Sequence, residues 1–352
     1  MNLTGSQQSA ITARGNVLVV AGAGTGKTRT LVDRCLHVLS ATGERVSLDE
    51  LLLVTFTEAA AAEMRRRIRS RIQERIAADP ADAWWAEQQA IFDAANIGTL
   101  HSFCLRLVRE HFYELELDPQ VSVLAPEEGR LLAQETLDKL LQPHYEGGDA
   151  FAASVQRLIQ IYGRGADEAI RALVLKLHDY TQTLPGPELW LRGQLAMFES
   201  PDPVLWREWL LAATSDWRGR WLAALSKPSS ENKVAEQCLG LLREFSDGAD
   251  ARQRAAVLQS VLGAVENCPR GKKKAWLEPI EGLFGEAEFL HSLSKAPGDQ
   301  GLEPLGEDWS WVREDMATLL QLASSFSEAF TGSKRELGVL DFHDLEQYAL
   351  RL

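Results

Sequence analysis

The sequence predicts an α/β fold with a parallel sheet and a large, mostly helical inserted domain. The chain has 352 residues, and at about 150 residues per domain this length allows a little over two domains. Hydrophobic residues make up 45% of it, which is enough to build a sizeable core. Short apolar runs alternate with long helical patterns up to residue 112, whereas helical periodicity dominates from Asp118 onward. The first pattern predicts the sheet, and the second predicts the helical domain.

The first 112 residues contain three predicted strands, each followed by a predicted helix. The strands are expected at residues 17–20, 51–55 and 96–98, and the helices at 28–40, at 58–78 and from about His101. The middle strand, Leu-Leu-Leu-Val-Thr, is apolar enough to be buried. Because strands that alternate with helices pair side by side in parallel, these segments predict one parallel sheet.

From Asp118 onward the apolar residues recur at helical spacing. We expect helices at 127–141, 151–162 and 167–180, followed by a break at Leu184–Pro187. Four tryptophans also recur at helical spacing, and we interpret them as anchors of helix packing rather than as platforms for nucleic-acid bases: Trp206, Trp209, Trp217 and Trp221.

A glycine-rich loop follows the first predicted strand and precedes a predicted helix. Its sequence from Ala21 to Thr28 is Ala-Gly-Ala-Gly-Thr-Gly-Lys-Thr, and it predicts a P-loop nucleoside-triphosphatase (RecA-like) sheet that binds ATP or GTP. Glycines let backbone N–H groups turn inward around a phosphate, and the helix directs its positive end to the same place. The predicted nucleotide contacts are Ala21, Gly22, Ala23, Gly24, Thr25, Gly26, Lys27 and Thr28.

Lys27 and Thr28 are the predicted catalytic residues of this loop. Lys27 would reach the terminal phosphates, and the Thr28 hydroxyl would hold Mg²⁺. Ala21 stands where the usual pattern has glycine, at the end of the predicted strand, where a positive φ is not needed. Arg29 either contacts phosphate or is a surface residue of the first predicted helix without a ligand. The alternative for the whole segment is a glycine-rich turn without a ligand.

The net charge of −13 does not exclude DNA as a partner, because the acidic residues are unevenly distributed. Residues 1–112 hold 13 Lys and Arg against 12 Asp and Glu, and the rest of the chain holds 24 against 38. Phosphate contact depends on the local surface rather than on the total. The four widely spaced cysteines predict reduced thiols in a cytoplasmic protein, and no apolar stretch approaches the roughly 20 residues of a membrane span.

Four motifs occur in the order and spacing that is typical of superfamily 1 helicases of the UvrD/Rep type. They are Leu3-Thr4 with Gln7, the glycine-rich loop, the segment Thr55 to Arg65, and the segment Gly98 to Cys104. Three details resemble most closely the AddA and RecB helicase-nuclease subunits of double-strand-break resection complexes. These are Thr-Glu-Ala-Ala at 57–60, His-Ser-Phe-Cys at 101–104 and Leu-Asp-Phe-His-Asp-Leu-Glu at 340–346.

The resemblance implies an ATP-dependent DNA helicase that moves 3′ to 5′ and acts in double-strand-break repair and recombination. It divides the chain into the first part of motor domain 1A (1–117), a helical insertion 1B (118–335) and a return to domain 1A (336–352). The implied cofactors are ATP and Mg²⁺, and the implied partners are single-stranded and duplex-end DNA and an AddB-like subunit. Gln7 would bind the adenine edge. The DNA contacts would be Thr55, Phe56, Thr57, Arg65, Thr99, His101 and Ser102.

Several of these implied roles have a structural alternative. Phe56 and His101 either stack on bases or belong to the core at a strand end. Arg65 opens a run with Arg66, Arg67, Arg69, Arg71 and Arg75 on one predicted helix, which either contacts the DNA backbone or forms a solvated face.

In this family the segment Leu-Asp-Phe-x-Asp-Leu-Glu precedes a D-E-x-Q-D motif and a second motor domain, and neither appears before Leu352. Val339-Leu340-Asp341 is too short an apolar run to replace that motif. We therefore expect an N-terminal fragment that binds nucleotide without the full hydrolytic site. Two alternatives remain: a UvrD/Rep-type repair helicase, and a nucleotide-dependent DNA-binding module without turnover.

Overall fold

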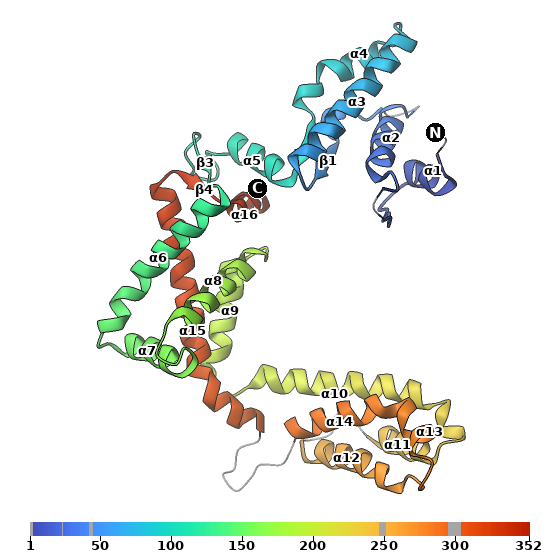
Figure 1. Ribbon diagram of the computed structural model, residues 1–352, viewed down its shortest axis with the longest axis vertical. Coiled ribbons are helices and arrows are strands. Elements are labelled where there is room, and N and C mark those ends of the chain that lie inside the picture. Colours follow the sequence, from blue (N-terminus) through green and yellow to red (C-terminus); the bar gives the residue numbers. More distant parts are fainter. Residues whose placement is uncertain (1–2, 23, 42–44, 246–250, 295–303) are drawn as a thin grey trace. The chain divides into compact units, whose positions relative to one another are not determined.

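The chain forms two compact units, which are described separately below. Figure 1 shows the computed structural model, which describes residues 3–22, 24–41, 45–245, 251–294 and 304–352. The first unit consists of Met1–Arg130 together with Lys334–Leu352, and the second consists of Leu131–Ser333. Most described residues lie in helices, and the strands form two small parallel sheets.

The first unit contains two of the three predicted strands, each followed by its predicted helix. Its elements are α1 (Gly5–Thr12), α2 (Lys27–Leu39), β1 (Leu52–Thr55), α3 (Glu58–Ala78), α4 (Ala83–Ala90), β2 (Asn96–Thr99), α5 (Leu100–Glu110), β3 (Ser122–Val123), β4 (Val339–Leu340) and α16 (Phe342–Arg351). Two further helices cross from one unit to the other along the chain, α6 (Pro126–Glu146) and α15 (Pro304–Glu336). The predicted helices at 28–40 and 58–78 are confirmed.

The two sheets are parallel and have two strands each. Strand β1 pairs with β2 from Leu52↔Asn96 to Thr55↔Thr99. Strand β3 pairs with β4 over two residues. The strands predicted at 51–55 and 96–98 are therefore confirmed, together with their parallel pairing. The middle strand is less buried than predicted, because only Leu53 of its apolar residues faces the core.

The strand predicted at residues 17–20 is wrong. These residues form no strand, and Leu18 and Val20 are 88% and 87% exposed. An apolar run becomes a strand only where a neighbour supplies ladder hydrogen bonds and apolar cover. Among the described residues β1 pairs only with β2 and β3 only with β4, so no strand pairs with this run. A single continuous sheet is accordingly not formed by the described part of the chain.

The core of the first unit fixes which face of α3 is buried. Met64, Ile68 and Ile72 recur every fourth residue and are fully buried against β1, β2, α2 and α4. Residues at this spacing lie on one face of a helix, so the arginines between them occupy the other faces. A separate apolar cluster joins α5 to β4 and α16 and contains Cys104, Val108, Val121, Leu340, Leu345 and Tyr348.

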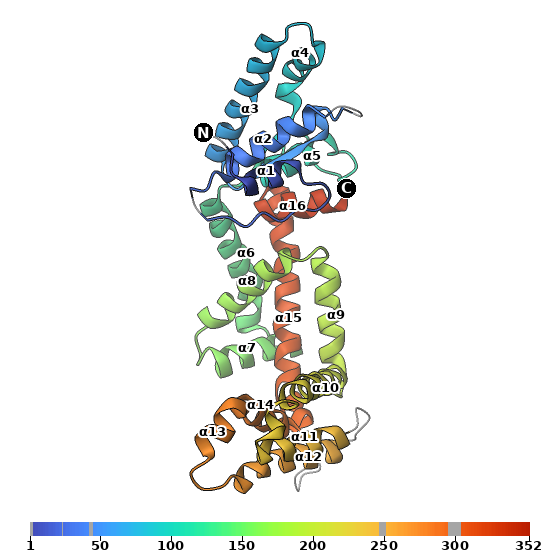
Figure 2. The same ribbon diagram turned by 90° about the vertical axis from the view of Figure 1, so that its right-hand side faces the viewer.

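The second unit is entirely helical in its described part. Besides parts of α6 and α15 it contains α7 (Ala150–Tyr162), α8 (Glu168–Gln182), α9 (Pro187–Glu199), α10 (Val204–Leu225), α11 (Lys233–Glu244), α12 (Ala251–Gly263), α13 (Lys273–Leu277) and α14 (Glu281–Leu293). The helices predicted at 127–141, 151–162 and 167–180 are confirmed. In Figure 2 helix α15 runs between α9 and the pair α7 and α8, in agreement with the apolar clusters that it shares with them.

Three of the four singled-out tryptophans pack as predicted. Trp217 is 1% exposed in the core formed by α10, α11, α12 and α14, and Trp206 and Trp221 pack against that core. Trp209 departs from the prediction, because it is 56% exposed. Of the helices that the structure describes, none combines the length and the apolar character needed to cross a membrane.

Candidate functional site

Gln7 is held by a capping interaction that aims its amide at the glycine-rich loop. Its backbone N–H donates to Thr4 Oγ1 (3.3 Å), and its Oε1 accepts from the Thr4 backbone N–H (2.9 Å). This reciprocal pair closes the start of α1. The remaining amide nitrogen, Nε2, donates to the backbone carbonyl of Thr25 at 3.1 Å. Two sequence motifs 18 residues apart are thereby joined.

The glycine-rich loop needs glycine where the prediction placed it. Gly24 and Gly26 have φ values of 76° and 86°, a region that side chains rarely tolerate. A Cβ on Gly26 would also lie 3.3 Å from Gln7 Nε2. Thr25 Oγ1 donates to the carbonyl of Gly22 at 2.8 Å. Ala23, a predicted nucleotide contact, lies outside the described residues.

The ammonium group of Lys27 hydrogen-bonds to the beginning of this loop. Its Nζ donates to the carbonyls of Ala21 (2.7 Å) and Gly22 (2.9 Å). Gly26, at the N-cap of α2, has no side chain that would occupy the N–H groups of the first turn. A helix start with a neighbouring ammonium is suited to a polyphosphate, since both supply positive charge and N–H donors. Thr28 is exposed in that same turn.

Two arginines near the loop have structural contacts. Arg29 Nε lies 3.7 Å from Asp33 Oδ2, one turn further along α2. Arg34 donates from Nη1 to the carbonyls of Ala10 (2.8 Å) and Ala13 (2.9 Å). Arg34 therefore fastens the end of α1 to α2 and supports the position of Gln7. It was not predicted as a site residue, because the carbonyls that it binds are 21 to 24 residues away in the sequence.

The structure brings the two predicted DNA motifs together at the ends of β1 and β2. Thr55 and Thr99 are register partners. Each strand leads into a helix whose N-cap is a threonine: Thr57 accepts from the Ala60 N–H at 3.2 Å, and Thr99 accepts from the Ser102 N–H at 3.2 Å. These hydroxyl oxygens serve the backbone, as capping residues do.

Glu58 and the side chain of Ser102 complete this edge of the sheet. Thr99 Oγ1 donates to Glu58 Oε1 at 2.9 Å and so links the starts of α5 and α3. Ser102 Oγ donates to the Thr99 carbonyl at 2.9 Å. Glu58 was not predicted as a site residue. Two signals could have found it: its place in the Thr-Glu-Ala-Ala segment at 57–60, and its acidic side chain in the first turn of a helix.

Phe56 and His101 differ in their surroundings. The Phe56 side chain is fully exposed, so its alternative role in the core is excluded. The His101 ring lies 4.6 Å from the ring of Phe342 at a tilt of 51°, and its Nε2 lies 3.1 Å from Glu346 Oε1. Phe342 and Glu346 are four residues apart on α16 and therefore share a helix face. The spacing places both side chains on one face, but nothing in the local sequence indicated that this face contacts His101.

Arg65 is turned toward the sheet. Its Nε donates to the Ile97 carbonyl of β2 at 2.6 Å. The next two arginines point elsewhere: Arg66 and Arg67 both donate to Glu63, at 2.8 Å and 2.7 Å. The predicted basic run is thus divided between two sides of α3.

A buried ion cluster anchors the start of α16. Lys334 is 3% exposed, and its Nζ lies 2.7 Å from Asp341 Oδ2 and 2.6 Å from Asp344 Oδ2. Asp341 is the N-cap of α16 and accepts from the Asp344 N–H at 2.9 Å. Burial raises the pKa of Asp344. Burial acts in the same direction on Asp341, but the Lys334 charge and hydrogen bond outweigh it and lower that pKa.

Substitution of Gly98 by alanine tests the packing at this edge of the sheet. A Cβ at this position would lie 2.5 Å from Ser102 Oγ, so Gly98→Ala forces the hydroxyl away from the Thr99 carbonyl. We expect a loss of about 1 kcal/mol of unfolding free energy in urea denaturation, the typical contribution of one hydrogen bond. In a Ser102→Ala background the same substitution should cost much less. Equal costs in both backgrounds would contradict this account.

The comparisons with known proteins agree with the geometry. A family model described as "UvrD/REP helicase N-terminal domain" matches residues 3–352. The chain belongs to this family. Within the described residues, no cluster of three or more His, Cys, Asp or Glu side chains could hold a metal ion.

The chain is also similar to curated helicase-nuclease proteins. It is 32% identical over 390 residues to the A-subunit of the ATP-dependent helicase/nuclease from Heliobacterium modesticaldum, an alignment that covers 99% of this chain and 28% of the relative. The proteins of the same name from Listeria innocua and Geobacillus thermodenitrificans are 30% and 31% identical, each over 99% of this chain and 30% of the relative. The predicted resemblance to AddA-type helicase-nuclease proteins is thereby confirmed. The chain spans less than a third of the length of these relatives.

Proposed function

We propose that this chain is the nucleotide-binding motor domain 1A, with its helical insertion 1B, of an ATP-dependent DNA helicase. The observation that carries the proposal is the hydrogen bond from Gln7 Nε2 to the Thr25 carbonyl, which joins an amide suited to a nucleobase edge to a phosphate-binding loop. The positive φ at Gly24 and Gly26 supports the same assignment. In this proposal domain 1A comprises residues 1–117 and 336–352, and domain 1B comprises 118–335.

The phosphates would lie at the start of α2. Lys27 would move its Nζ from the carbonyls of Ala21 and Gly22 to the terminal phosphates, and the backbone N–H groups of the loop would bind the phosphates nearer the ribose. Thr28 is the proposed ligand of Mg²⁺, whose chemistry is to bridge and neutralise phosphate oxygens. Gln7 would bind the adenine edge, and Arg29 would contact a phosphate.

Single-stranded DNA would bind along the ends of β1 and β2. Phe56 offers an exposed aromatic face, and His101 offers a ring whose orientation is set by Phe342 and Glu346. This edge is shaped mainly by capping hydrogen bonds, and its polar residues are Thr55, Thr57, Thr99 and Ser102. The Arg65 Nε donates to the Ile97 carbonyl of β2, and its terminal nitrogens would bind a DNA phosphate.

The two aromatic residues give the test of the DNA assignment. We expect Phe56→Ala and His101→Ala each to weaken binding of a labelled oligothymidylate by about 1 to 3 kcal/mol, since base–aromatic stacking contributes that much per base. The loss should depend little on base sequence. Tyr113→Ala is the matched control, because Tyr113 is an aromatic residue of the same unit, 85% exposed, and follows the C-terminal end of α5 rather than the end of a strand of the β1–β2 sheet. Binding unchanged in both site variants would refute the assignment.

The activity of the whole protein is proposed from the resemblance alone. It would be a 3′ to 5′ helicase of double-strand-break repair, located in the cytoplasm, that acts on duplex ends with an AddB-like partner. The four cysteines are free thiols, which suits a reducing compartment. A UvrD/Rep-type repair helicase and a nucleotide-dependent DNA-binding module without turnover are the other candidates. DNA-stimulated ATP hydrolysis by this chain would exclude the last of them.

A further inference from the structure

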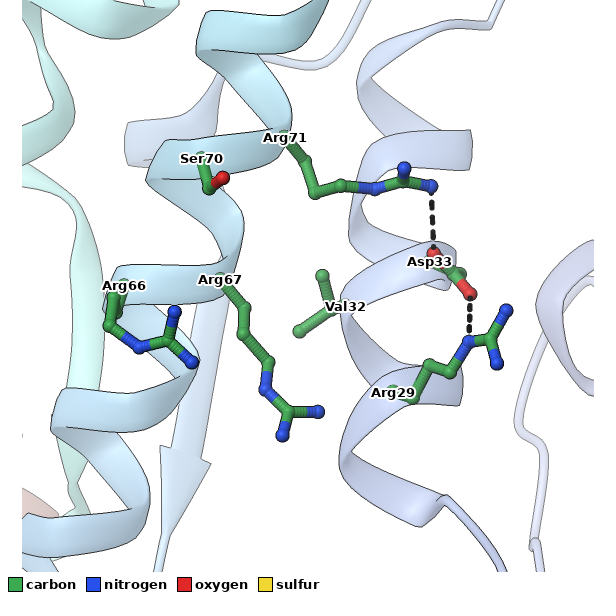
Figure 3. A pocket seen from close by; sticks show the side chains of 7 residues that line it. All are labelled: Arg29, Val32, Asp33, Arg66, Arg67, Ser70 and Arg71. Carbon is green, nitrogen blue, oxygen red and sulfur yellow. Dashed lines mark hydrogen bonds and ion pairs between the residues drawn. The ribbon is translucent and has the colours of Figure 1, made fainter. Parts of the chain in front are cut away.

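A cleft between α2 and α3 is lined by four arginines, of which the proposed function uses only Arg29. It has a volume of about 270 Å³. This is many times the space that a single water molecule needs, so a phosphate group fits within it. Figure 3 shows its lining side chains, which are Arg29, Val32, Asp33, Arg66, Arg67, Ser70 and Arg71.

Helix geometry gathers these residues on two facing surfaces. Arg67 and Arg71 are four residues apart on α3, and Arg29 and Asp33 are four residues apart on α2. Val32, which is 4% exposed, packs between the two helices and keeps them in place. The arginine positions are therefore set by the same packing that buries the other face of α3.

The arginines of the cleft share their carboxylate partners. Arg66 and Arg67 share one carboxylate, Glu63, and these two guanidinium groups lower its pKa to about 2. Arg71 and Arg29 both face Asp33, at 3.4 Å and 3.7 Å, and Arg71 also reaches Glu74 at 3.1 Å. Of these three carboxylates only Asp33 lines the cleft, together with all four guanidinium groups.

Arg67 supplies unused hydrogen-bond donors. Its Nε donates to Glu63, and within the described part of the chain neither terminal nitrogen has a partner. In Figure 3 these nitrogens lie between the two helices, and the hydroxyl-bearing Ser70 lies on the same wall. A guanidinium group matches the geometry of phosphate oxygens and binds two of them at once.

We propose that this cleft is a second anion site, which binds a phosphate group through Arg67 and Arg71. The phosphate is carried either by a nucleic-acid backbone or by a free polyphosphate. The two arginines of this proposal have no part in the proposed function, and neither Lys27 nor the ends of the sheet line the cleft.

The test uses the full chain with Lys27→Ala, which removes the main cation of the loop and so separates the two anion sites. In this background Arg67→Gln is compared with Arg75→Gln, an exposed arginine of the same helix that does not line the cleft. Titration with inorganic pyrophosphate tests the free-polyphosphate source. Titration with oligothymidylate at several salt concentrations tests the backbone source.

We expect Arg67→Gln to weaken binding of one of the two probes by about tenfold or more, since a hydrogen bond between charged groups contributes that much. If DNA is the source, the salt slope should also fall by about 0.7, the value for one lost single-strand phosphate. Arg71→Gln should give the same direction of change. Equal losses in Arg67→Gln and Arg75→Gln, or no loss in either probe, would overturn the proposal.

Discussion

Replacement of Lys27 by alanine should abolish tight binding of Mg²⁺-ATP. Among the described residues the ammonium group hydrogen-bonds only to the carbonyls of Ala21 and Gly22, so its removal deletes the main point charge of the loop and breaks no contact with another of the described elements. Charge-assisted hydrogen bonds contribute about 1.5 to 3 kcal/mol each, so the loss of two of them to the terminal phosphates would raise the dissociation constant at least about a hundredfold. Isothermal titration calorimetry with a non-hydrolysable ATP analogue measures this effect.

The control for Lys27 is another lysine with no role in the loop. Lys176 is exposed on α8 of the second unit, and Lys176→Ala makes the same change of charge. This variant should bind the analogue as the wild type does. Tight binding that survives Lys27→Ala would disprove the assignment of the loop as a phosphate site.

Replacement of Lys334 by methionine should unfold the region around α16. The ammonium group pairs with Asp341 and Asp344, and all three side chains are largely buried. Removing one partner of a buried ion pair costs about 3 to 5 kcal/mol, because a buried charge is left uncompensated. We therefore expect hydrogen exchange of the α16 amides to accelerate at neutral pH by about a hundredfold or more.

The pH dependence of this variant follows from the two carboxylates. In the native protein Lys334 lowers the pKa of Asp341, so this group stabilises the fold at neutral pH and loses that effect as the pH falls through its folded-state pKa. Without Lys334, burial raises the pKa of both carboxylates above their unfolded values. The loss of protection should therefore shrink as the pH falls to about 4, where unfolded-state carboxyl groups take up protons.

The matched control for Lys334 is its neighbour Arg335, an exposed residue of the same helix. Arg335→Met removes the same charge from the same turn of α15 and should leave exchange of the α16 amides unchanged. If both variants accelerate exchange equally, the effect belongs to the helix and not to the buried cluster.

The local patterns of the first unit were predictable from the sequence. The bounds of α3 agree with the predicted range, because its apolar residues recur at helical spacing and Thr57 caps its first turn. The start of α5 agrees for the same reason, with Thr99 as its cap. The conformation of the glycine-rich loop also followed from its residues, because only glycine readily adopts the positive φ that Gly24 and Gly26 have.

The features that were not predicted correctly from the sequence depend on contacts between distant segments. Residues 17–20 have the apolar composition of a strand, yet they form none, because pairing partners are a property of the whole sheet. The contacts of His101 with Phe342 and Glu346 join residues about 240 positions apart, beyond the reach of any local pattern.

The sequence by itself therefore determined the helix periods, the caps and the conformation of the glycine-rich loop, since these depend on residues within a turn or two of each other. The tertiary structure alone decided three other features. It placed Gln7 on the loop through Arg34, it buried Lys334 between two aspartates, and it set the arginines of α3 opposite α2. Each depends on which distant segments pack together, and packing is chosen by the burial of the whole apolar surface rather than by any single segment.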